Sequence, residues 1–283
     1  MILLDMNQVM YSKLVVSVGQ HTNIDIGLSS FRRMVVAEIR HLNAKFSPEY
    51  GQLIIVSDSR NYWRKHYFPH YKASRKKARD KSELDWPTLF KHMDQVKNEL
   101  RDSFPYKYMN VEGAEADDII ATLCSVVSVT QPLEKSLIIS GDKDFFQLHS
   151  DVVEQYDPVH EKFFKVESKE QALFEHILKG DRGDGIPNVA SPDNSLVLGI
   201  RQKPMTQKLL ASLSNIANEP DSPYYRNYIR NKTLIDLSLI PSDIKATIVD
   251  EFNTTLKVDR FKLKVYLASH KLSEHLESIS DFF

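Results

Sequence analysis

The sequence predicts an α/β protein with a twisted, mostly parallel sheet flanked by helices, followed by a smaller C-terminal helical domain. Two patterns predict this fold. Over the first 156 residues, short runs rich in isoleucine, leucine and valine alternate with longer tracts of helical periodicity, which is typical of a parallel sheet. Later in the chain, helical tracts follow one another, separated by turns, and we expect them to form a unit of their own.

Three short apolar runs have the composition of buried parallel strands, at residues 2–4, 53–56 and 137–139. Each run is followed almost at once by an aspartate. The intervening tracts predict helices at 28–45, 86–100 and 114–127. The single cysteine, Cys124, lies in the last of these tracts, so we expect a packed thiol and no disulfide or cysteine-built metal site.

The pattern changes after Tyr156, where an Asp157-Pro158 turn precedes the segment EKFFKV. A helical tract then ends at Gly180, and prolines punctuate the junction that follows. We expect the later helices at 169–179, 205–213, 225–235 and 242–252. These patterns predict a core domain of residues 1–179 and a C-terminal helical domain of residues 180–283.

The composition is that of an ordinary water-soluble protein, with 283 residues, 42% hydrophobic and 27% charged, and a formal net charge of −1. No stretch approaches the ~20 consecutive apolar residues that a membrane span needs, and polar residues interrupt the N-terminal segment too early for a signal peptide. Collagen-like and disordered classes are excluded. We therefore expect a cytoplasmic protein with no membrane contact.

The near-neutral total conceals one strongly basic segment. Residues 60–81 hold nine lysines and arginines against Asp80 alone, a formal charge of +8, so the rest of the chain carries −9. A local excess of this size attracts phosphate groups. The total charge therefore does not exclude a nucleic-acid partner.

The order of residues within this basic segment is informative. The stretch RNYWRKHYFPHY, which contains Arg64 and Tyr71, mixes aromatic rings with basic residues, as sites for single-stranded nucleic acid do. The alternative is a solvated basic helix that rests on an aromatic core patch. The next basic residues are Lys72, Arg75, Lys76 and Arg79. Their spacing of i, i+3, i+4 and i+7 predicts that they lie on one face of a helix.

Acidic residues follow the predicted strands and open one predicted helix. In an open α/β sheet, the loops at the carboxyl ends of the strands converge on one crevice. Gathered carboxylates repel one another unless protons or a cation neutralise them, and oxygen donors favour Mg²⁺ or Mn²⁺. Each acid alone could complement a helix dipole or make a turn. Together they predict a divalent-metal site built from Asp5, Asp58, Glu115, Asp117, Asp118, Asp142 and Asp144.

The segment GDRGDGIP adds Asp181 and Asp184 after a predicted helix, and either could complete the metal site; a solvated turn is the alternative. Two divalent ions about 4 Å apart activate a water and stabilise the leaving oxygen of a phosphodiester. With the basic segment beside the crevice, these residues predict a metal-dependent phosphodiesterase that acts on nucleic acid. The polarity of cleavage and the shape of the substrate stay open at this point.

Six motifs carry these residues, in the order LLDMNQ, VSDSRNYWR, PHYKASR, EADD, SGDKDFFQL and KGDRGDGIPNV. In this order and spacing, and over nearly the whole chain, they resemble the 5′-nuclease superfamily of flap endonucleases, and within it the ribonucleases H of T-even bacteriophages. The resemblance implies a sheet of the PIN and 5′-nuclease type with a helical arch at about residues 60–85. It also implies that the C-terminal domain grips duplex DNA and starts like a helix-hairpin-helix.

The resemblance further implies roles for the site residues. One Mg²⁺ would lie among Asp5, Asp58, Glu115 and Asp117, and a second among Asp142, Asp144 and Asp181. Asp118 and Asp184 would support the ions through water, and Mn²⁺ would substitute for Mg²⁺. Lys72 and Arg75 would be the catalytic residues that contact the scissile phosphate. Tyr71 would stack on the displaced base, and further contacts with nucleic acid are expected from Arg64, Lys76 and Arg79.

By the same resemblance, the activity is that of a 5′-to-3′ exonuclease and flap endonuclease that removes RNA primers and adjacent DNA from lagging-strand fragments during phage replication. The expected partners are branched or nicked duplex DNA and RNA–DNA hybrid, recognised by shape, together with a sliding clamp and a single-stranded DNA-binding protein. We expect a monomer in the host cytoplasm. Two alternatives remain: a PIN-type ribonuclease for single-stranded RNA, and a non-catalytic module that binds single-stranded DNA.

The chain departs from the family pattern at two places. After GDGIPNV it lacks the glycine-rich hairpin that holds K⁺ against the DNA backbone, which counts against a K⁺ site; phosphate contacts are expected instead from Arg201, Lys203 and Lys208. At the C-terminus, the apolar tail of Ile279, Phe282 and Phe283 resembles a sliding-clamp-binding peptide without its usual glutamine. Docking of the tail on the chain's own core is the alternative.

Overall fold

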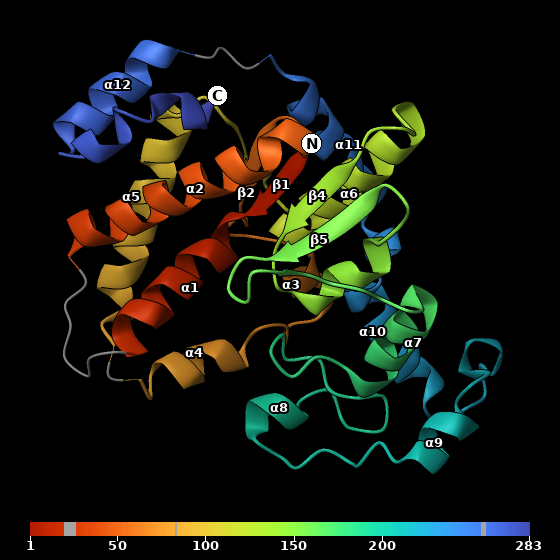
Figure 1. Cartoon of the computed structure of the whole chain (residues 1–283). Helices are drawn as coiled ribbons and strands as arrows, with labels where there is room; N and C mark the ends of the chain where they lie inside the picture. The colour runs from red at the N-terminus through yellow and green to blue at the C-terminus, as the bar shows by residue number, and fades with distance from the viewer. Residues whose placement is uncertain (20–26, 83, 256–258) are drawn as a thin grey trace.

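A six-stranded sheet forms the centre of the computed structural model, which describes residues 1–19, 27–82, 84–255 and 259–283 (Figure 1). The strand order is β3-β2-β1-β4-β5-β6; neighbours among β1 to β5 are parallel, and β6 is antiparallel to β5. The predicted, mostly parallel sheet is confirmed. The strands are β1 Ile2–Asp5, β2 Leu53–Val56, β3 Lys107–Met109, β4 Ser136–Ile139, β5 Val153–Asp157 and β6 Lys162–Phe163.

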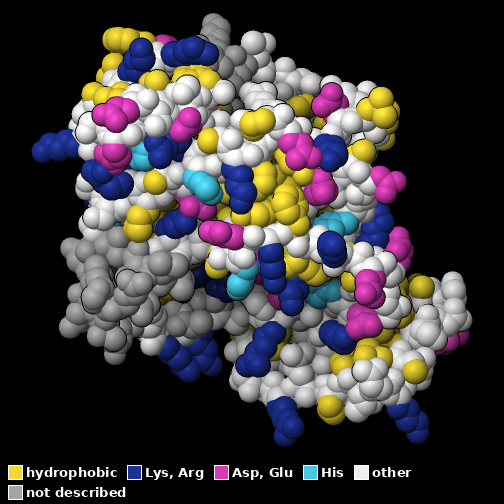
Figure 2. Space-filling model, in the orientation of Figure 1, with side chains coloured by type: hydrophobic (Ala, Val, Ile, Leu, Met, Phe, Trp, Pro, Cys, Tyr) yellow, Lys and Arg dark blue, Asp and Glu magenta, His cyan; other side chains and the backbone are white. Residues whose placement is uncertain are grey.

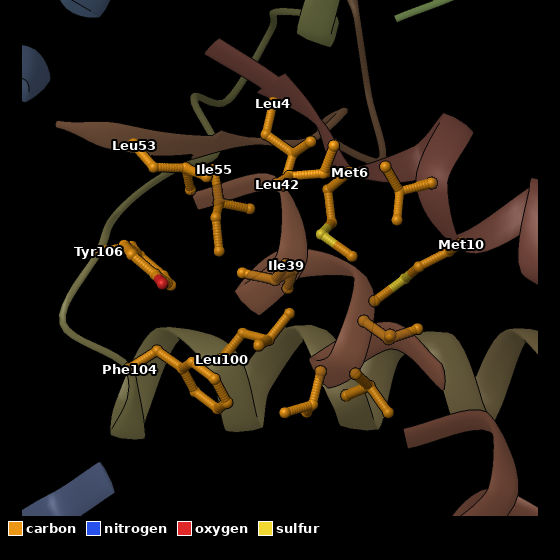
Figure 3. Packing of buried hydrophobic residues seen from close by; sticks show 14 of the residues in the cluster. Leu4, Met6, Met10, Ile39, Leu42, Leu53, Ile55, Leu100, Phe104 and Tyr106 are labelled. Atoms are coloured by element: carbon orange, nitrogen blue, oxygen red, sulfur yellow. The ribbon is translucent and has the colours of Figure 1, made fainter. Parts of the chain in front are cut away.

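Three helices cover one face of the sheet: α1 Met6–Gly19, α2 Leu28–Tyr50 and α5 Trp86–Ser103 (Figure 1). Alternate strand residues point to this face, because successive side chains of a strand point to opposite sides. Leu4 of β1 and Ile55 of β2 pack here against Ile39 of α2 and Leu100 of α5 (Figure 3). This packing makes the largest apolar cluster among the described residues.

The opposite face is covered by α6 Ala116–Thr130 and α11 Ser242–Asn253 (Figure 1). Leu3 and Ile54, which are the sequence neighbours of Leu4 and Ile55, pack against α6, and Ile248 of α11 joins the same cluster. Cys124 lies in this cluster, where burial raises the pKa of its thiol to about 12. The prediction of an inert, packed cysteine is therefore confirmed.

The segment between β2 and α5, in the region expected to form the arch, holds two short helices, α3 Trp63–Tyr67 and α4 Ser74–Arg79. Residue 83 of this region lies outside the described residues. The aromatic residues Tyr62, Phe68 and Tyr71 pack in a third cluster against α7 Lys169–Lys179 and α10 Tyr225–Ile235. The root of the basic segment is therefore packed against the helical part of the chain.

C-terminal residues also complete the two sheet-facing clusters, since α11 packs on α6 and Leu263 and Leu267 of α12 Arg260–Ser269 pack beside α5. The division at residue 179 stays a prediction. Among the described residues, no helix is both long and apolar enough to cross a membrane. The remaining elements are η1 Lys143–Leu148, α8 Ser195–Leu198, α9 Gln207–Ser212, η2 Ile216–Asn218, η3 Leu237–Leu239, η4 Ser273–His275 and η5 Ile279–Phe282.

The predicted helices are present, and those at 169–179 and 225–235 have the predicted bounds. The predictions missed helices α1 and α12, the short helices α3 and α8, and strands β3, β5 and β6. Strand β5 escaped because polar Glu154 and Gln155 interrupt its apolar pattern; the Gln155 amide is buried and donates to the carbonyl oxygens of Ser140 and Asp142. Helix α1 begins at Met6, directly after β1, so no turn residue marks its start.

Candidate active site

The predicted acids gather at the carboxyl edge of the sheet, beside β1, which lies between β2 and β4 at the point where the strand order reverses. Asp5 is the last residue of β1 and pairs in register with Val56 of β2. Asp58 follows β2, Asp142 follows β4, and Asp144 lies in η1. Three strand ends therefore present carboxylates to one crevice.

The start of α6 brings three more acids to this crevice. Glu115 is the N-cap residue of α6, and its side chain accepts a hydrogen bond from the backbone of Asp118, whose side chain accepts one from the backbone of Glu115. The Asp58 carboxylate accepts a bond of 2.8 Å from the Ala116 amide, which ties the end of β2 to the same helix start. This capping box fixes Glu115 and Asp118, and Asp117 lies between them in the first turn.

Asp181 and Asp184 reach the crevice from a turn after α7. Gly180, with φ of 67°, lets the chain reverse there, and an added Cβ would lie 2.4 Å from the carbonyl oxygen of Ile186. Asp181 then accepts a hydrogen bond of 2.9 Å from the Asp184 amide. All nine predicted acids thus come from elements that end or begin at this crevice.

Several of these carboxylates lack sufficient neutralisation by protein cations. Burial, together with the charges of Asp58 and Asp142, raises the pKa of Asp5 to about 7. Burial and the charge of Asp142 raise the pKa of Asp144 to about 8, and the same two causes hold the pKa of Asp117 well above its ordinary value. Surplus negative charge on oxygen donors suits a hard divalent cation, so the donor set fits Mg²⁺ or Mn²⁺.

Three other acids already face protein cations. Arg64 forms ion pairs with Glu115 at 2.9 Å and with Asp118 at 2.8 Å. Lys72 lies 2.5 Å from Glu115 and 3.5 Å from Asp184, and the guanidinium of Arg75 pairs with the same Asp184. Glu115, Asp118 and Asp184 are therefore held in place by the basic segment.

The structure contradicts the single helical face predicted for the four basic residues that begin at Lys72. Helix α4 starts at Ser74, and Lys72 precedes it with φ of 54°, in the left-handed region. Its amide donates a bond of 2.7 Å to the carbonyl oxygen of Asp184, and its side chain, 11% exposed, turns into the crevice. Burial alone would lower the pKa of Lys72, but the charges of Asp184 and Glu115 outweigh burial and raise it.

Arg64 and Tyr71 were expected at a nucleic-acid surface, and the structure corrects both predictions. The Arg64 side chain is buried between Glu115 and Asp118, and its Nε donates to the carbonyl oxygen of Leu234. Tyr71 is also buried, and its hydroxyl lies 2.6 Å from Asp184 and 3.1 Å from Glu115. Sequence composition cannot distinguish a basic and aromatic surface from a buried network of ion pairs, and here the network forms.

The other predicted contacts are on the surface. Arg75 is 46% exposed although it pairs with Asp184, Lys76 is exposed on α4, and the Arg79 guanidinium lies 5.4 Å from the Phe90 ring centroid. Figure 2 shows lysine and arginine side chains projecting over the lower half of this face, where α4, α8 and α9 lie in Figure 1. Arg201 and Lys203 are exposed on the loop after α8, and Lys208 is exposed on α9.

One residue of the crevice, His176, was not among the predicted ligands. It lies on α7, with its Nδ1 atom 3.2 Å from Asp144 and its Nε2 atom 3.3 Å from Asp181. Ligand atoms of these three residues all lie within 4.8 Å of one another. Burial would lower the pKa of His176, but its hydrogen bond with Asp181 and the charge of Asp144 outweigh burial and raise it. The available signal was its position in the last turn of a helix that ends beside Asp181.

Of the two alternatives for the C-terminal tail, the structure supports docking on the chain's own core. Phe282 in η5 is fully buried and stacks edge-on with Phe104, with ring centroids 5.8 Å apart. Ile279 packs against the same apolar cluster, and the Asp281 carbonyl oxygen accepts a bond of 2.8 Å from Asn43 of α2. Ile279 is half-buried, and Phe283 is 39% exposed. The tail therefore docks on the chain's own core, because burial of its apolar side chains is available there.

Family comparisons agree with this geometry. Residues 1–177 match the family described as 5′-3′ exonuclease, N-terminal resolvase-like domain, and residues 167–282 match the family described as T4 RNase H, C terminal. The chain belongs to the 5′-3′ exonuclease family. Membership identifies it as a 5′ nuclease, and it accounts for the order of the acidic motifs along the chain.

Two curated relatives place this 5′-3′ exonuclease more closely. Ribonuclease H of Enterobacteria phage T4 is 31% identical over 294 residues, which cover 99% of this chain and 95% of the phage protein. Flap endonuclease Xni of Shewanella woodyi is 29% identical over 162 residues, which cover 54% of this chain and 58% of that protein. The resemblance to the ribonucleases H of T-even phages is therefore confirmed.

Solved structures share the fold of this 5′-3′ exonuclease. A variant of the bacteriophage T5 flap endonuclease, in a pseudo-enzyme-product complex with DNA and metal ions, has a TM-score of 0.64 at 17% identity and covers 89% of this chain and 97% of that one. The T5 5′-exonuclease with bound zinc has a TM-score of 0.63 at 18% identity, with coverage of 89% and 98%. These similarities support the sheet architecture alone.

Proposed function

We propose that this protein is a Mg²⁺-dependent 5′-to-3′ exonuclease and flap endonuclease that removes RNA primers and adjacent DNA from lagging-strand fragments during phage replication. The observation that carries the proposal is the gathering of nine carboxylates, with surplus negative charge, at the carboxyl edge of the sheet beside a basic segment. Family membership supports it, as do the names of the relatives: one is called a ribonuclease H and another a flap endonuclease.

The carboxylates divide between two divalent ions in this proposal. Asp5, Asp58 and Asp117, with Glu115, would hold one ion, and Asp142, Asp144 and Asp181 would hold the other, while Asp118 and Asp184 support them. When bound, the ions supply an activated water and stabilise the leaving oxygen. Among the solved neighbours, one T5 protein binds DNA and metal ions and another binds zinc.

Lys72 and Arg75 are proposed to bind the scissile phosphate. Both already neutralise Asp184 at the rim of the crevice, and Arg75 is half-exposed, so an arriving phosphate meets two cations that are oriented in advance. Lys72 is held on two sides, through its backbone bond to Asp184 and its ion pair with Glu115. These two contacts hold its positive charge at a fixed position beside the acids.

Basic residues outside the crevice are proposed to hold the phosphate backbone. Lys76 and Arg79 lie on α4, whereas Arg201 and Lys203 follow α8 and Lys208 lies on α9, so the two groups would contact different parts of a branched duplex. K⁺ is not part of the proposal, because the segment after Gly185 contains the short helix α8 and two prolines in place of a glycine-rich hairpin.

The test is cleavage of 5′-labelled flap, nicked and RNA-primed duplexes with Mg²⁺, in wild type and in Asp142→Asn. We expect junction-dependent cleavage from the wild type, and far slower cleavage with retained DNA binding from the variant. Asp151→Asn is the matched control, because Asp151 is exposed in a turn away from the crevice and loses the same charge. Binding without cleavage in Mg²⁺ or Mn²⁺ would leave only a DNA-binding module. Cleavage of single-stranded RNA without preference for a junction would favour a PIN-type ribonuclease.

A further inference from the structure

His176 connects two acids that come from different elements. Its Nδ1 atom faces Asp144 of η1 at 3.2 Å, and its Nε2 atom faces Asp181 of the turn after α7 at 3.3 Å. The side chain is 24% exposed, and those of the two acids are 17% and 29% exposed. The imidazole therefore lies between the two carboxylates, and each of them has a different ring nitrogen as its neighbour.

The hydrogen-bonding chemistry of this arrangement is restrictive. An ionised carboxylate only accepts hydrogen bonds, and a neutral imidazole has one N–H donor and one acceptor nitrogen. In either tautomer the ring therefore has an N–H donor for at least one of these acids. A ring that acts as a direct metal ligand would instead point one nitrogen at the ion that both acids share.

The backbone around His176 holds the ring in this position. The His176 carbonyl oxygen accepts a bond of 2.8 Å from the Gly180 amide, and the positive φ of Gly180 turns the next residue, Asp181, back toward the helix. The next residue of α7, Ile177, is fixed by a bond of 2.8 Å from Asn231 of α10 to its carbonyl oxygen. A packed helix therefore positions the imidazole between acids that come from a 3₁₀ helix and a turn.

We propose that His176 is a positioning residue, whose ring lies between Asp144 and Asp181 and so sets the separation of two carboxylates that hold the second divalent ion. This inference rests on the proposed function, because the ion belongs to that site. The ring contacts neither substrate nor reacting atoms.

The first test is Mn²⁺ binding to the full-length protein, without a polyhistidine tag and without DNA, by isothermal titration calorimetry. Residues that orient a metal ligand through a hydrogen bond typically change metal affinity by 10–100-fold. We expect two ions in the wild type, and in His176→Gln a loss of about 10-fold or more in affinity for one ion only. His41→Gln, at an exposed position of α2, should bind as the wild type does.

The second test distinguishes positioning from direct ligation. In the Mn²⁺-loaded wild type, pulsed electron paramagnetic resonance should show no directly coordinated ¹⁴N. A ¹⁴N coupling that disappears in His176→Gln would overturn the proposal by making His176 a ligand, and unchanged Mn²⁺ affinity in a folded His176→Gln would overturn it too. The wild-type spectrum needs no variant, so a misfolded substitution does not remove the test. A wild type that binds no Mn²⁺ at all would contradict the proposed function itself.

Discussion

The ammonium group of Lys72 lies 2.5 Å from a carboxylate oxygen of Glu115, although the two residues lie on segments that sequence alone assigns to opposite roles, phosphate binding and metal binding. Lys72 is held by its backbone as well, through the bond from its amide to Asp184. Cation and acid therefore form one structural unit at the root of the arch. Glu115 and Asp184 therefore position the Lys72 ammonium group that is proposed to bind the substrate phosphate.

Substitution Lys72→Ala tests the catalytic role of this cation. We expect kcat on a 5′-flap duplex to fall by about 10²-fold, the scale of losing one oriented group that stabilises transition-state charge. DNA affinity should change little. Lys76→Ala is the control, because Lys76 is exposed on α4, and it should weaken binding at moderate salt with little effect on kcat. The rate constant of cleavage is also measured in single-turnover reactions. Equal losses of that rate constant in both variants would contradict a special role for Lys72.

Divalent ions should stabilise the folded protein, because the crevice carries surplus negative charge that repels itself in the metal-free state. An ion present at 100 times its Kd adds about 2.7 kcal/mol per site, which corresponds to a rise of several degrees in Tm. Differential scanning fluorimetry with MgCl₂ and after EDTA treatment measures the effect. Asp142→Asn should show a smaller rise, and Asp151→Asn the full rise; identical shifts in all three proteins would speak against ion binding in the crevice.

Substitution Gly180→Ala tests the turn that brings Asp181 to the crevice. The φ of 67° is costly for any residue with a Cβ, and here the added atom would meet the Ile186 carbonyl oxygen at 2.4 Å. Gly199→Ala is the control at a similar φ of 70°: its ψ of 23° is left-handed helical and nothing lies within 4 Å of an added Cβ, whereas Gly180 has a ψ of −179°, a region open essentially to glycine alone. Gly199→Ala should cost about 1–2 kcal/mol in unfolding free energy, and Gly180→Ala should cost more and also lower cleavage activity. Urea denaturation compares the two variants directly.

The docked C-terminal tail should contribute strongly to stability. Phe282→Ala removes a fully buried ring that packs on Phe104, and we expect a loss of about 3–5 kcal/mol in unfolding free energy. Phe283→Ala, at a side chain that is 39% exposed, should cost less than Phe282→Ala by a clear margin. A stable protein after removal of residues 280–283, with activity changed only in the presence of a sliding clamp, would contradict docking and restore the partner-binding hypothesis.

A buried histidine beside Phe282 should make the protein less stable in acid. His275 is buried, and neither of its ring nitrogens has a hydrogen-bond partner among the described residues. Burial lowers the pKa of His275, assisted by the charges of Arg40 and Arg33 and opposed by Glu274. His275 therefore binds a proton more readily in the unfolded chain than in the folded chain. The free energy of unfolding falls as the pH drops below ~6.5. Tm measured from pH 8 to pH 5 should fall less steeply in His275→Leu than in the wild type.

Strands β1, β2 and β4 were predictable because helices cover both faces of the sheet, which selects continuous apolar residues. Strand β3 lies at the edge of the sheet and has three residues, and β5 carries a buried glutamine, so neither has that signature. Helix α12 escaped because basic and apolar residues alternate in FKLKVY, a pattern with the period of a strand.

The acids of the site were predictable because strand ends and helix starts are visible in the sequence, and both lead to one edge of a parallel sheet. The partners of those acids were not. Arg64 and Tyr71 belong to a basic, aromatic stretch whose composition suits a surface, and only the fold reveals that they meet Glu115. His176 was missed because its role depends on the turn at Gly180, a three-dimensional relationship that no ligand spacing encodes.

The bond from the Lys72 amide to the Asp184 carbonyl oxygen has a consequence for the covalent chain. It fastens the root of the arch to a segment more than a hundred residues later, and Gly185 sits against the His70 carbonyl oxygen beside it. A protease that nicks the exposed helix α4 would therefore release the arch on one side only. Lys72 would stay anchored among the acids, and the two fragments would remain held together by their shared core.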